Sequence, residues 1–298
     1  MKNGGTHAKL LVVAIIWGIS WVAGRVVAAD VPPFTAGWIR YIIAVAFFLV
    51  FLRLTGRWII PAKTHWKLIC WIGFLSTFIY QFFFIYGMKY TAAGDASLVI
   101  TFNPIFTALL AIPFLGEKMD KRLGIGLVFA LGGVIVLFLY SPNIQIPFEQ
   151  RIWGNTMIAL SAISWAGASI LMKKAMSHPT DPLSPLNLTV WASLVGLLIQ
   201  TPAALWEMWH LGFSNPSADA WYGIVFLAIL STVLSYVWFA NGIKVIGASR
   251  AALYVYLVPI FGIISGWLMI DEQLSFSLLV SFALIVGGVS YAQSKESS

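Results

Sequence analysis

The stretch Leu10–Ala29 reads LLVVAIIWGISWVAGRVVAA, and Arg25 is its only charged residue. A helix needs about 20 predominantly apolar residues to cross the hydrocarbon core of a bilayer, so this stretch predicts a transmembrane helix. Nine further stretches share this character. The ten predicted spans are Leu10–Ala29, Phe34–Leu54, Trp66–Tyr86, Ala93–Phe114, Lys121–Tyr140, Ile152–Met176, Leu186–Trp206, Ala220–Val245, Ala248–Ile270 and Leu274–Gln293.

The composition agrees with a membrane environment. Of the 298 residues, 60% are hydrophobic and only 10% are charged, whereas soluble domains carry roughly 25% charged residues. In lipid each span must be helical, because its backbone groups have no water to bond. The sequence therefore predicts an all-α membrane protein of ten transmembrane helices. The short connections leave no room for a soluble catalytic domain, and a full-length first span argues against a cleavable signal peptide.

The net charge of +7 is distributed unevenly along the chain. With the N-terminus inside, the outer loops hold only Lys89 and Arg151, and nearly all other basic residues lie on the inner side. This positive-inside bias predicts a multi-pass protein of the cell (inner) membrane with both termini in the cytoplasm. We therefore interpret the basic charge as a topology signal, expect the lipid bilayer as a partner, and expect no nucleic acid.

The chain contains an internal repeat. A shift of 155 residues aligns Gly73–Val134 with Ala228–Val289 without a gap, and a shorter shift aligns the earlier helices of each half. We expect two five-helix repeats, residues 1–140 and 151–293. Because five is odd, the second repeat is inverted in the membrane. Matched positions include Ser76 and Ser231, Thr77 and Thr232, Pro104 and Pro259, Glu117 and Glu272, Gly132-Gly133 and Gly287-Gly288, Trp17 and Trp165, and Arg25 and Lys173.

An inverted repeat favours a transporter. Each half can adopt the arrangement that the other half leaves, so an inward-open state implies an outward-open one, with the ligand site near the midplane. The alternative is that duplication merely built a larger membrane protein.

Several short motifs together resemble one family. Trp17-Gly18-Ile19-Ser20-Trp21, Gly94-Asp95-Ala96-Ser97 and the two Gly-Gly-Val motifs resemble the drug/metabolite transporter superfamily in its EamA-domain branch. The resemblance implies a ten-helix secondary carrier with a central cavity, usually one that exports amino acids or related metabolites. Two departures stand out. Thr189 occupies the second-half position that corresponds to Arg40, and the first and sixth spans lack the glutamate with which small multidrug pumps exchange protons.

Charged residues inside spans are costly and mark candidate sites. Arg25, Arg40 and Asp95 are expected near the outer mouth. They could anchor a substrate carboxylate with Asp95 as partner or gate, or they could form a structural ion pair. For Arg40 we favour the structural role. Asp95 aligns with Arg250, which suggests a charged gate at each mouth.

Aromatic and hydroxyl side chains form the predicted substrate site. Thr77, Tyr80, Gln81 and Phe84 share one helix face, and few fixed charges accompany them, which suits a zwitterion or an amphipathic solute. Such residues also form interfacial belts or bond between helices. The full candidate set is Trp17, Trp21, Thr77, Tyr80, Gln81, Phe84, Thr101, Trp165, Ser235, Trp238 and Tyr256.

Two further features concern helix shape and association. Pro104 and Pro259 are predicted to bend their helices at equivalent places. Gly262 and Gly266 form a GxxxG pair, which we interpret as internal packing rather than as a dimer contact. A monomer and a homodimer both remain open.

Enzyme and metal motifs are not found. The sequence lacks the G-x-x-x-x-G-K-S/T pattern of ATP-driven pumps and any metal-binding spacing of Cys and His, so we expect neither catalysis nor a cofactor. The favoured function is a secondary transporter that exports small metabolites, amino acids first among them, by alternating access. Efflux of cationic or amphipathic drugs is the second candidate. A passive channel or facilitator is the alternative class, and a membrane-embedded enzyme or assembly factor is the third.

Overall fold

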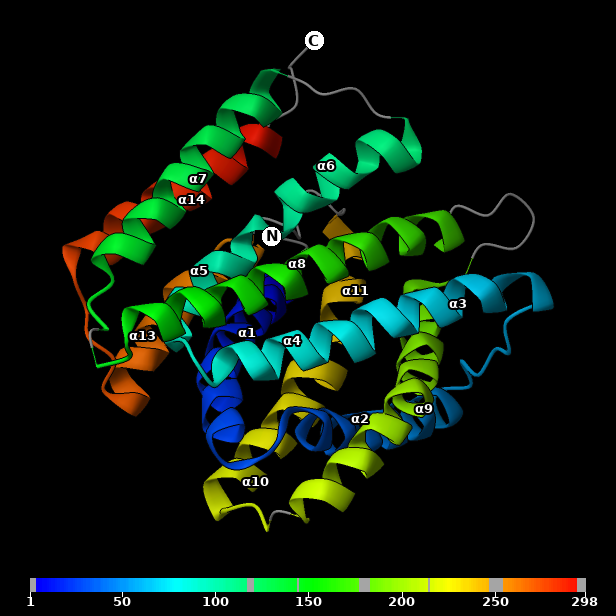
Figure 1. Ribbon diagram of the computed structural model, residues 1–298. Helices are drawn as coiled ribbons and strands as arrows, with labels where there is room; N and C mark the ends of the chain where they lie inside the picture. Colours follow the sequence, from blue (N-terminus) through cyan, green and yellow to red (C-terminus); the bar gives the residue numbers. More distant parts are fainter. Residues whose placement is uncertain are drawn as a thin grey trace.

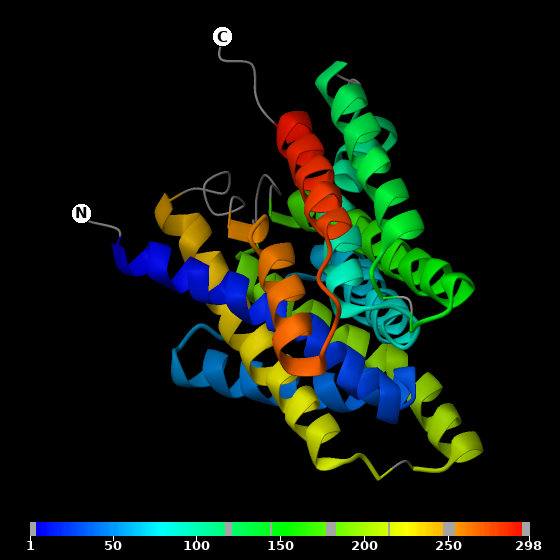
Figure 2. The same ribbon diagram turned by 90° about the vertical axis from the view of Figure 1, so that its left-hand side faces the viewer.

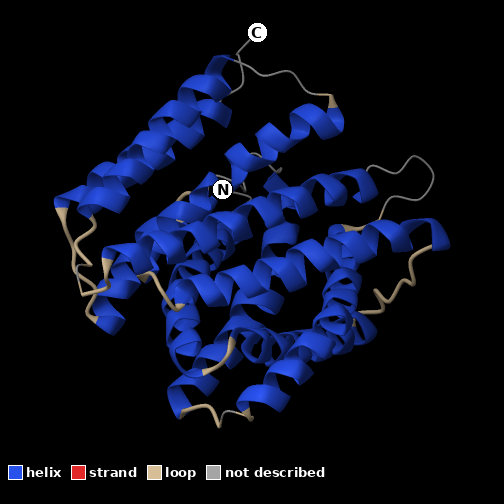
Figure 3. Ribbon diagram, in the orientation of Figure 1, coloured by secondary structure: helices blue, strands red, loops and turns tan. Residues whose placement is uncertain are grey.

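The computed structural model describes residues 4–116, 121–143, 145–176, 183–213, 215–246 and 254–293. In these residues every regular element is a helix and there is no strand (Figure 1, Figure 3). The first half holds α1 (Gly4–Asp30), α2 (Pro33–Leu54), η1 (Lys63–His65), α3 (Trp66–Gly73), η2 (Phe74–Ile79), α4 (Tyr80–Met88), α5 (Ala93–Val99), η3 (Ile100–Phe102), α6 (Asn103–Leu115) and α7 (Lys121–Tyr140). The second half holds α8 (Phe148–Met176), α9 (Pro185–Leu211), α10 (Ala218–Val225), η4 (Phe226–Leu234), α11 (Ser235–Ile246), α13 (Val258–Ile270) and α14 (Phe276–Gln293).

Eight helical segments are long and apolar enough to cross a bilayer. The ninth and tenth predicted spans correspond to shorter apolar helices, Val258–Ile270 and Phe276–Ala292. Part of the predicted span Ala248–Ile270 lies outside the described residues. The described residues are thus all-helical, with eight helices long and apolar enough to cross a membrane and two shorter apolar helices.

The outer surface of the helices is apolar. Large hydrophobic side chains such as Val128 on α7, Leu268 on α13 and Phe276 on α14, which is 79% exposed, point away from the core. A soluble protein avoids a continuous apolar surface of this kind, whereas lipid tails solvate it. The interior, in contrast, holds many buried Ser, Thr and Asn side chains.

Two segments have π-helical geometry, which the sequence did not predict. The segment η2 separates α3 from α4, and η4 separates α10 from α11. The 155-residue shift carries Phe74–Ile79 onto residues 229–234, inside η4. The hydroxyl of Thr232 donates to the carbonyl of Leu227, five residues earlier, as the wider turn allows. Wide turns of this type are frequent at functional sites.

The two prolines that the internal repeat aligns, Pro104 and Pro259, lie in the first turns of helices rather than in helix interiors. The fourth predicted span is divided into α5, a 3-10 turn at η3, and α6, and Pro104 lies in the first turn of α6. Pro259 lies in the first turn of α13. A proline in the first turn loses no helical hydrogen bond, because its missing N–H would have no partner there. Pro113, by contrast, lies inside α6.

Helices of the two halves pack on each other in corresponding pairs. α1 packs on the α10–η4–α11 segment and on α13, while α8 packs on the η2–α4 segment and on α6. α2 packs on α9, and α7 lies beside α14 (Figure 1, Figure 2). The repeat converts the contacts of α1 into those of α8, and the reverse. It converts the α2–α9 pair and the α7–α14 pair each into itself.

Glycines permit the closest of these approaches. A Cβ at Gly288 of α14 would meet the carbonyl oxygen of Gly126 at 2.6 Å, so α7 and α14 touch through their backbones. A Cβ at Gly262 would meet the side chain of Ser97 at 2.6 Å, and one at Gly266 would meet Glu272 Oε2 at 2.5 Å. The GxxxG pair therefore packs within the chain.

Candidate functional site

A central cavity of about 830 Å³ lies between helices of both halves. This volume falls in the range of small-molecule sites, roughly 300–1,000 Å³. Its lining residues come from α1, α2, η2, α4, η3, α6, α8, α9, η4, α11 and α13. Eight of the predicted substrate-binding residues line it: Trp17, Trp21, Thr77, Tyr80, Phe84, Thr101, Trp165 and Tyr256.

Three predicted substrate-binding residues do not line this cavity. Gln81 is only 1% exposed, and its Oε1 accepts a hydrogen bond of 2.9 Å from Arg40 Nη1. The hydroxyl of Ser235 donates to the carbonyl of Leu230 in its own helix. Trp238 lines a separate pocket of about 720 Å³, where Lys9 lies over its ring.

The cavity wall is a nearly continuous aromatic surface. The ring centroids of Trp21 and Phe84 lie 5.3 Å apart, and those of Tyr80 and Trp165 lie 5.4 Å apart. Such distances are typical of favourable aromatic pairs. The same wall carries Tyr236 and Phe239. The 155-residue shift aligns these two residues with residues of the third predicted span.

Some lining residues were not predicted. Asn103, Thr107 and Ser169 add polar atoms to the wall, and Lys173 lies at its edge. Asn103 follows directly after the 3-10 turn of η3, so its exposure to the cavity depends on the helix break. The pairing of Lys173 with Arg25 in the repeat is the sequence feature that could have indicated a role for it.

Arg40 lines the central cavity. Its side chain is 7% exposed. Nη1 donates to Gln81 Oε1 at 2.9 Å and Nη2 donates to Thr232 Oγ1 at 3.0 Å. The guanidinium carbon lies 5.9 Å from the centre of the Phe84 ring. Among the described residues, no carboxylate lies within ion-pair distance of Arg40, so its hydrogen bonds to other helices go to neutral acceptors.

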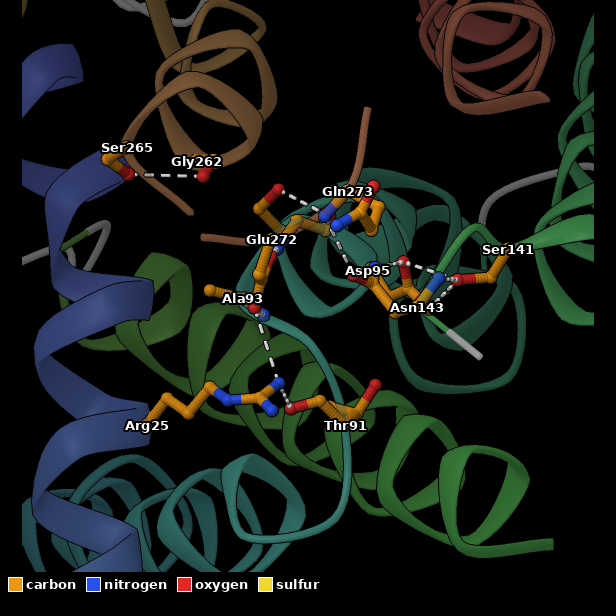
Figure 4. Close-up of polar contacts among 12 residues, drawn as sticks. Arg25, Thr91, Ala93, Asp95, Ser141, Asn143, Gly262, Ser265, Glu272 and Gln273 are labelled. Carbon is orange, nitrogen blue, oxygen red and sulfur yellow. Dashed lines mark hydrogen bonds and ion pairs between the residues drawn. The ribbon is translucent and has the colours of Figure 1, made fainter. Parts of the chain in front are cut away.

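A network centred on Glu272 joins residues of the two halves (Figure 4). Arg25 Nη1 forms an ion pair of 3.2 Å with Glu272 Oε1 and donates to the carbonyl of Thr91 at 2.6 Å. The carboxylate of Glu272 also accepts from the backbone N–H groups of Ala93, at 2.6 Å, and Gly94, at 2.9 Å. It therefore caps the N-terminus of α5, where the helix dipole favours negative charge.

The hydrogen-bond partners of Asp95 are Ser141 and Asn143, not Arg25. Its carboxylate accepts from the hydroxyl of Ser141, at 2.9 Å, and from Nδ2 of Asn143, at 3.3 Å. It lies in the first turn of α5, but Glu272 supplies the cap. The sequence-based pairing of Arg25 with Asp95 is therefore replaced by a pairing with Glu272. Arg250, the predicted gate at the opposite mouth, lies outside the described residues.

The cavity does not extend to this network. Trp21 is the last residue of α1 that lines it, and Arg25 lies one helical turn further on. In the other direction the lining reaches Lys173, which is exposed near the end of α8. The residues of the Glu272 network are therefore absent from the lining, whereas the lining includes an exposed residue, Lys173, near the end of α8.

Comparisons with known proteins agree with this arrangement. The EamA-like transporter family matches residues 7–139 and 152–292. The uncharacterized transporter YetK of Bacillus subtilis (strain 168) is 24% identical over 290 residues, which cover 97% of this chain and 86% of YetK. A probable amino-acid metabolite efflux pump of Escherichia coli (strain K12) is 28% identical over 289 residues, covering 94% of this chain and 91% of the pump.

One solved crystal structure shares the fold. It is 21% identical in sequence, has a TM-score of 0.63, and the alignment covers 97% of this chain and 98% of that chain. The family match spans nearly the whole sequence in two segments, one in each half. The chain therefore belongs to the EamA-like transporter family and is a multi-pass membrane transporter.

Proposed function

We propose that this chain is a secondary transporter that exports amino acids or similar small metabolites by alternating access. The observation that carries the proposal is a central cavity lined by both halves, whose lining stops one helical turn before the Arg25–Glu272 ion pair and includes the exposed Lys173. The name of the Escherichia coli relative, a probable amino-acid metabolite efflux pump, favours amino acids among the possible solutes.

The proposed architecture is ten transmembrane helices in two inverted repeats, residues 1–140 and 151–293. Its support is the gapless internal alignment, the equivalent π-helical segments and the exchange of helix contacts between the halves. The positive-inside distribution of Lys and Arg supports cytoplasmic termini in the cell (inner) membrane. A lipid bilayer and a small solute are the proposed partners of the chain.

In this topology the Glu272 network lies on the outer side. The structure then corresponds to an inward-facing state, with its cavity reached from the side of Lys173. Alternating access requires that the network separates when the outer side opens. An ion pair with exposed fractions of 30% and 8% for its two side chains can separate at moderate cost, because one partner is already partly hydrated.

Counterflow in proteoliposomes tests the function. Purified protein is reconstituted, the vesicles are loaded with unlabelled amino acid, and uptake of the labelled compound is followed against protein-free vesicles. We expect a transient, saturable overshoot for at least one apolar or aromatic amino acid. Exchange of amphipathic cations alone would favour drug efflux, and linear, non-saturable flux would favour a channel. No exchange of any of these solutes would contradict the proposal.

A further inference from the structure

The central cavity contains a buried cation, Arg40, that has no carboxylate within ion-pair distance in the part of the chain that the structure describes. Arg40 is 7% exposed and is held by two neutral acceptors, Gln81 Oε1 and Thr232 Oγ1. Its Nε is buried and has no hydrogen-bond partner among the described residues. A guanidinium presents five N–H donors, and removing its charge from water without a counter-ion costs several kcal/mol. The site is therefore short of one negative group.

A second unsatisfied donor lies in the same wall. Trp21 lines the cavity, is 5% exposed, and its Nε1 has no partner among the described residues. Phe84 packs near both groups: its ring lies 5.3 Å from that of Trp21 and 5.9 Å from the guanidinium carbon of Arg40. Buried donors are nearly always paired in native proteins, so each orphan needs an explanation.

The charge of Arg40 has no counterpart at the equivalent position of the second half. Thr189 occupies the equivalent place in the second half and also lines the cavity, but its hydroxyl donates to Pro185 of its own helix. A purely architectural role would be satisfied equally well by a neutral side chain, as it is there. The asymmetry favours recognition of a ligand with a charged end.

We infer that Arg40 binds the carboxylate of the transported solute, whose apolar body lies against the aromatic wall. The inference rests on the proposed transport function and narrows its substrate class to carboxylates with an apolar or aromatic side chain. Arginine matches a carboxylate with two parallel hydrogen bonds, and the rings of Phe84, Tyr80 and Trp165 provide the complementary apolar surface. Amphipathic cations are disfavoured by the charge of Arg40.

The test compares matched acids and amides in counterflow. Phenylalanine and leucine carry a carboxylate, whereas phenylalaninamide and leucinamide keep the ammonium and the side chain but lose that charge. The variants are Arg40→Gln, Arg40→Lys and the control Arg53→Gln, which removes an exposed arginine from the same helix. Binding of the same four probes is measured in parallel by the fluorescence of the cavity tryptophans, with elution as a single peak as the folding check.

The wild-type protein and Arg53→Gln should prefer each acid over its amide by about tenfold or more, the value of a charge-assisted hydrogen bond. Arg40→Gln should lose that preference, and Arg40→Lys should retain part of it because it keeps the charge without the planar fork. If Arg40→Gln keeps the preference, the carboxylate site lies elsewhere and transport of amino acids still stands.

Wild-type protein that carries amides as well as acids would overturn the inference without any variant, which covers the case that Arg40→Gln does not fold. Wild-type protein that carries none of the four probes would also overturn the inference, whereas the proposed function itself would be contradicted only if no amino acid in the counterflow screen were exchanged.

Discussion

Arg25 and Glu272, which lie 247 residues apart in the chain, form an ion pair of 3.2 Å that links the first helix to the segment before the last one. The same carboxylate accepts the N–H groups of Ala93 and Gly94 at the start of α5. Three segments from the two halves thus meet at one side chain. Separating the halves at this end requires that Glu272 releases the arginine, the α5 N-terminus or both.

This relationship predicts strong coupling between Arg25 and Glu272. In a double-mutant cycle of Arg25→Gln and Glu272→Gln, the double variant should be little less stable than the worse single variant, with a coupling of roughly 0.5–3 kcal/mol. The measurement is the thermal unfolding midpoint of the purified protein in detergent. The parallel cycle of Arg25→Gln with Asp95→Asn should give a smaller coupling, because Asp95 bonds to Ser141 and Asn143 instead. Equal coupling in both cycles would contradict the assignment of Glu272.

A second prediction concerns the two Gly-Gly pairs at the contact of α7 and α14. A Cβ at Gly288 would meet backbone atoms of α7, whereas one at Gly287 would have nothing within 4 Å. Gly288→Ala should therefore destabilise the protein by about 1–3 kcal/mol through overpacking. Gly287→Ala should be neutral or stabilising by up to about 1 kcal/mol, as for an open helical glycine. The unfolding midpoints of the two variants give a direct comparison.

The first half offers the same comparison. Gly133 is crowded by Leu284 and Ile285, while Gly132 has open space around it. Gly133→Ala should follow Gly288→Ala, and Gly132→Ala should follow Gly287→Ala. If the open and crowded positions responded alike, the close packing of α7 on α14 would be wrong.

A third prediction follows from the neutral acceptor beside Arg40. Gln81 is buried, and its Oε1 lies 2.9 Å from Arg40 Nη1. Gln81→Glu would supply the missing counter-ion from the protein itself. It should raise the unfolding midpoint while lowering the affinity for carboxylate solutes about tenfold or more, because the internal carboxylate competes for the guanidinium. Tryptophan fluorescence titration with phenylalanine measures the affinity.

The control for this variant is Gln81→Leu. It removes the acceptor without adding charge, so it should lower the unfolding midpoint and leave Arg40 free to bind a carboxylate. If Gln81→Glu and Gln81→Leu reduced the affinity to the same extent, competition by an internal counter-ion would not be the cause.

Much of the fold could be predicted from the sequence, because membrane-spanning segments can be recognised by their length and apolar composition. The helical spacing of Tyr80 and Phe84 predicts that they share one helix face, and both line the cavity. The ion-pair partner of Arg25, in contrast, could not be predicted from the sequence. Its partner comes from a segment far away in the chain, where Glu272 lies beside Gly266 and accepts from the N–H of Ala93.

The sequence also does not show which face of α2 carries Arg40. α2 is apolar around its whole circumference, so no periodicity shows which face its single internal charge occupies. The π-helical segments are a further example, since the sequence of Leu75-Ser76-Thr77 is compatible with an ordinary helix. Each of these features is decided by contacts between helices rather than by local preference.

The measurement that tests alternating access most directly is the two-sided accessibility of a cavity residue. Ala108 lines the cavity on α6, and Cys70 is the single native cysteine. In an Ala108→Cys, Cys70→Ser protein, a membrane-impermeant thiol reagent should react from the face that carries Lys173 and not from the face that carries Glu272. Adding Glu272→Gln should open the second route and slow the first. Equal reaction from both faces in the protein with Glu272 intact, or no reaction from either, would contradict a cavity that opens to one side at a time.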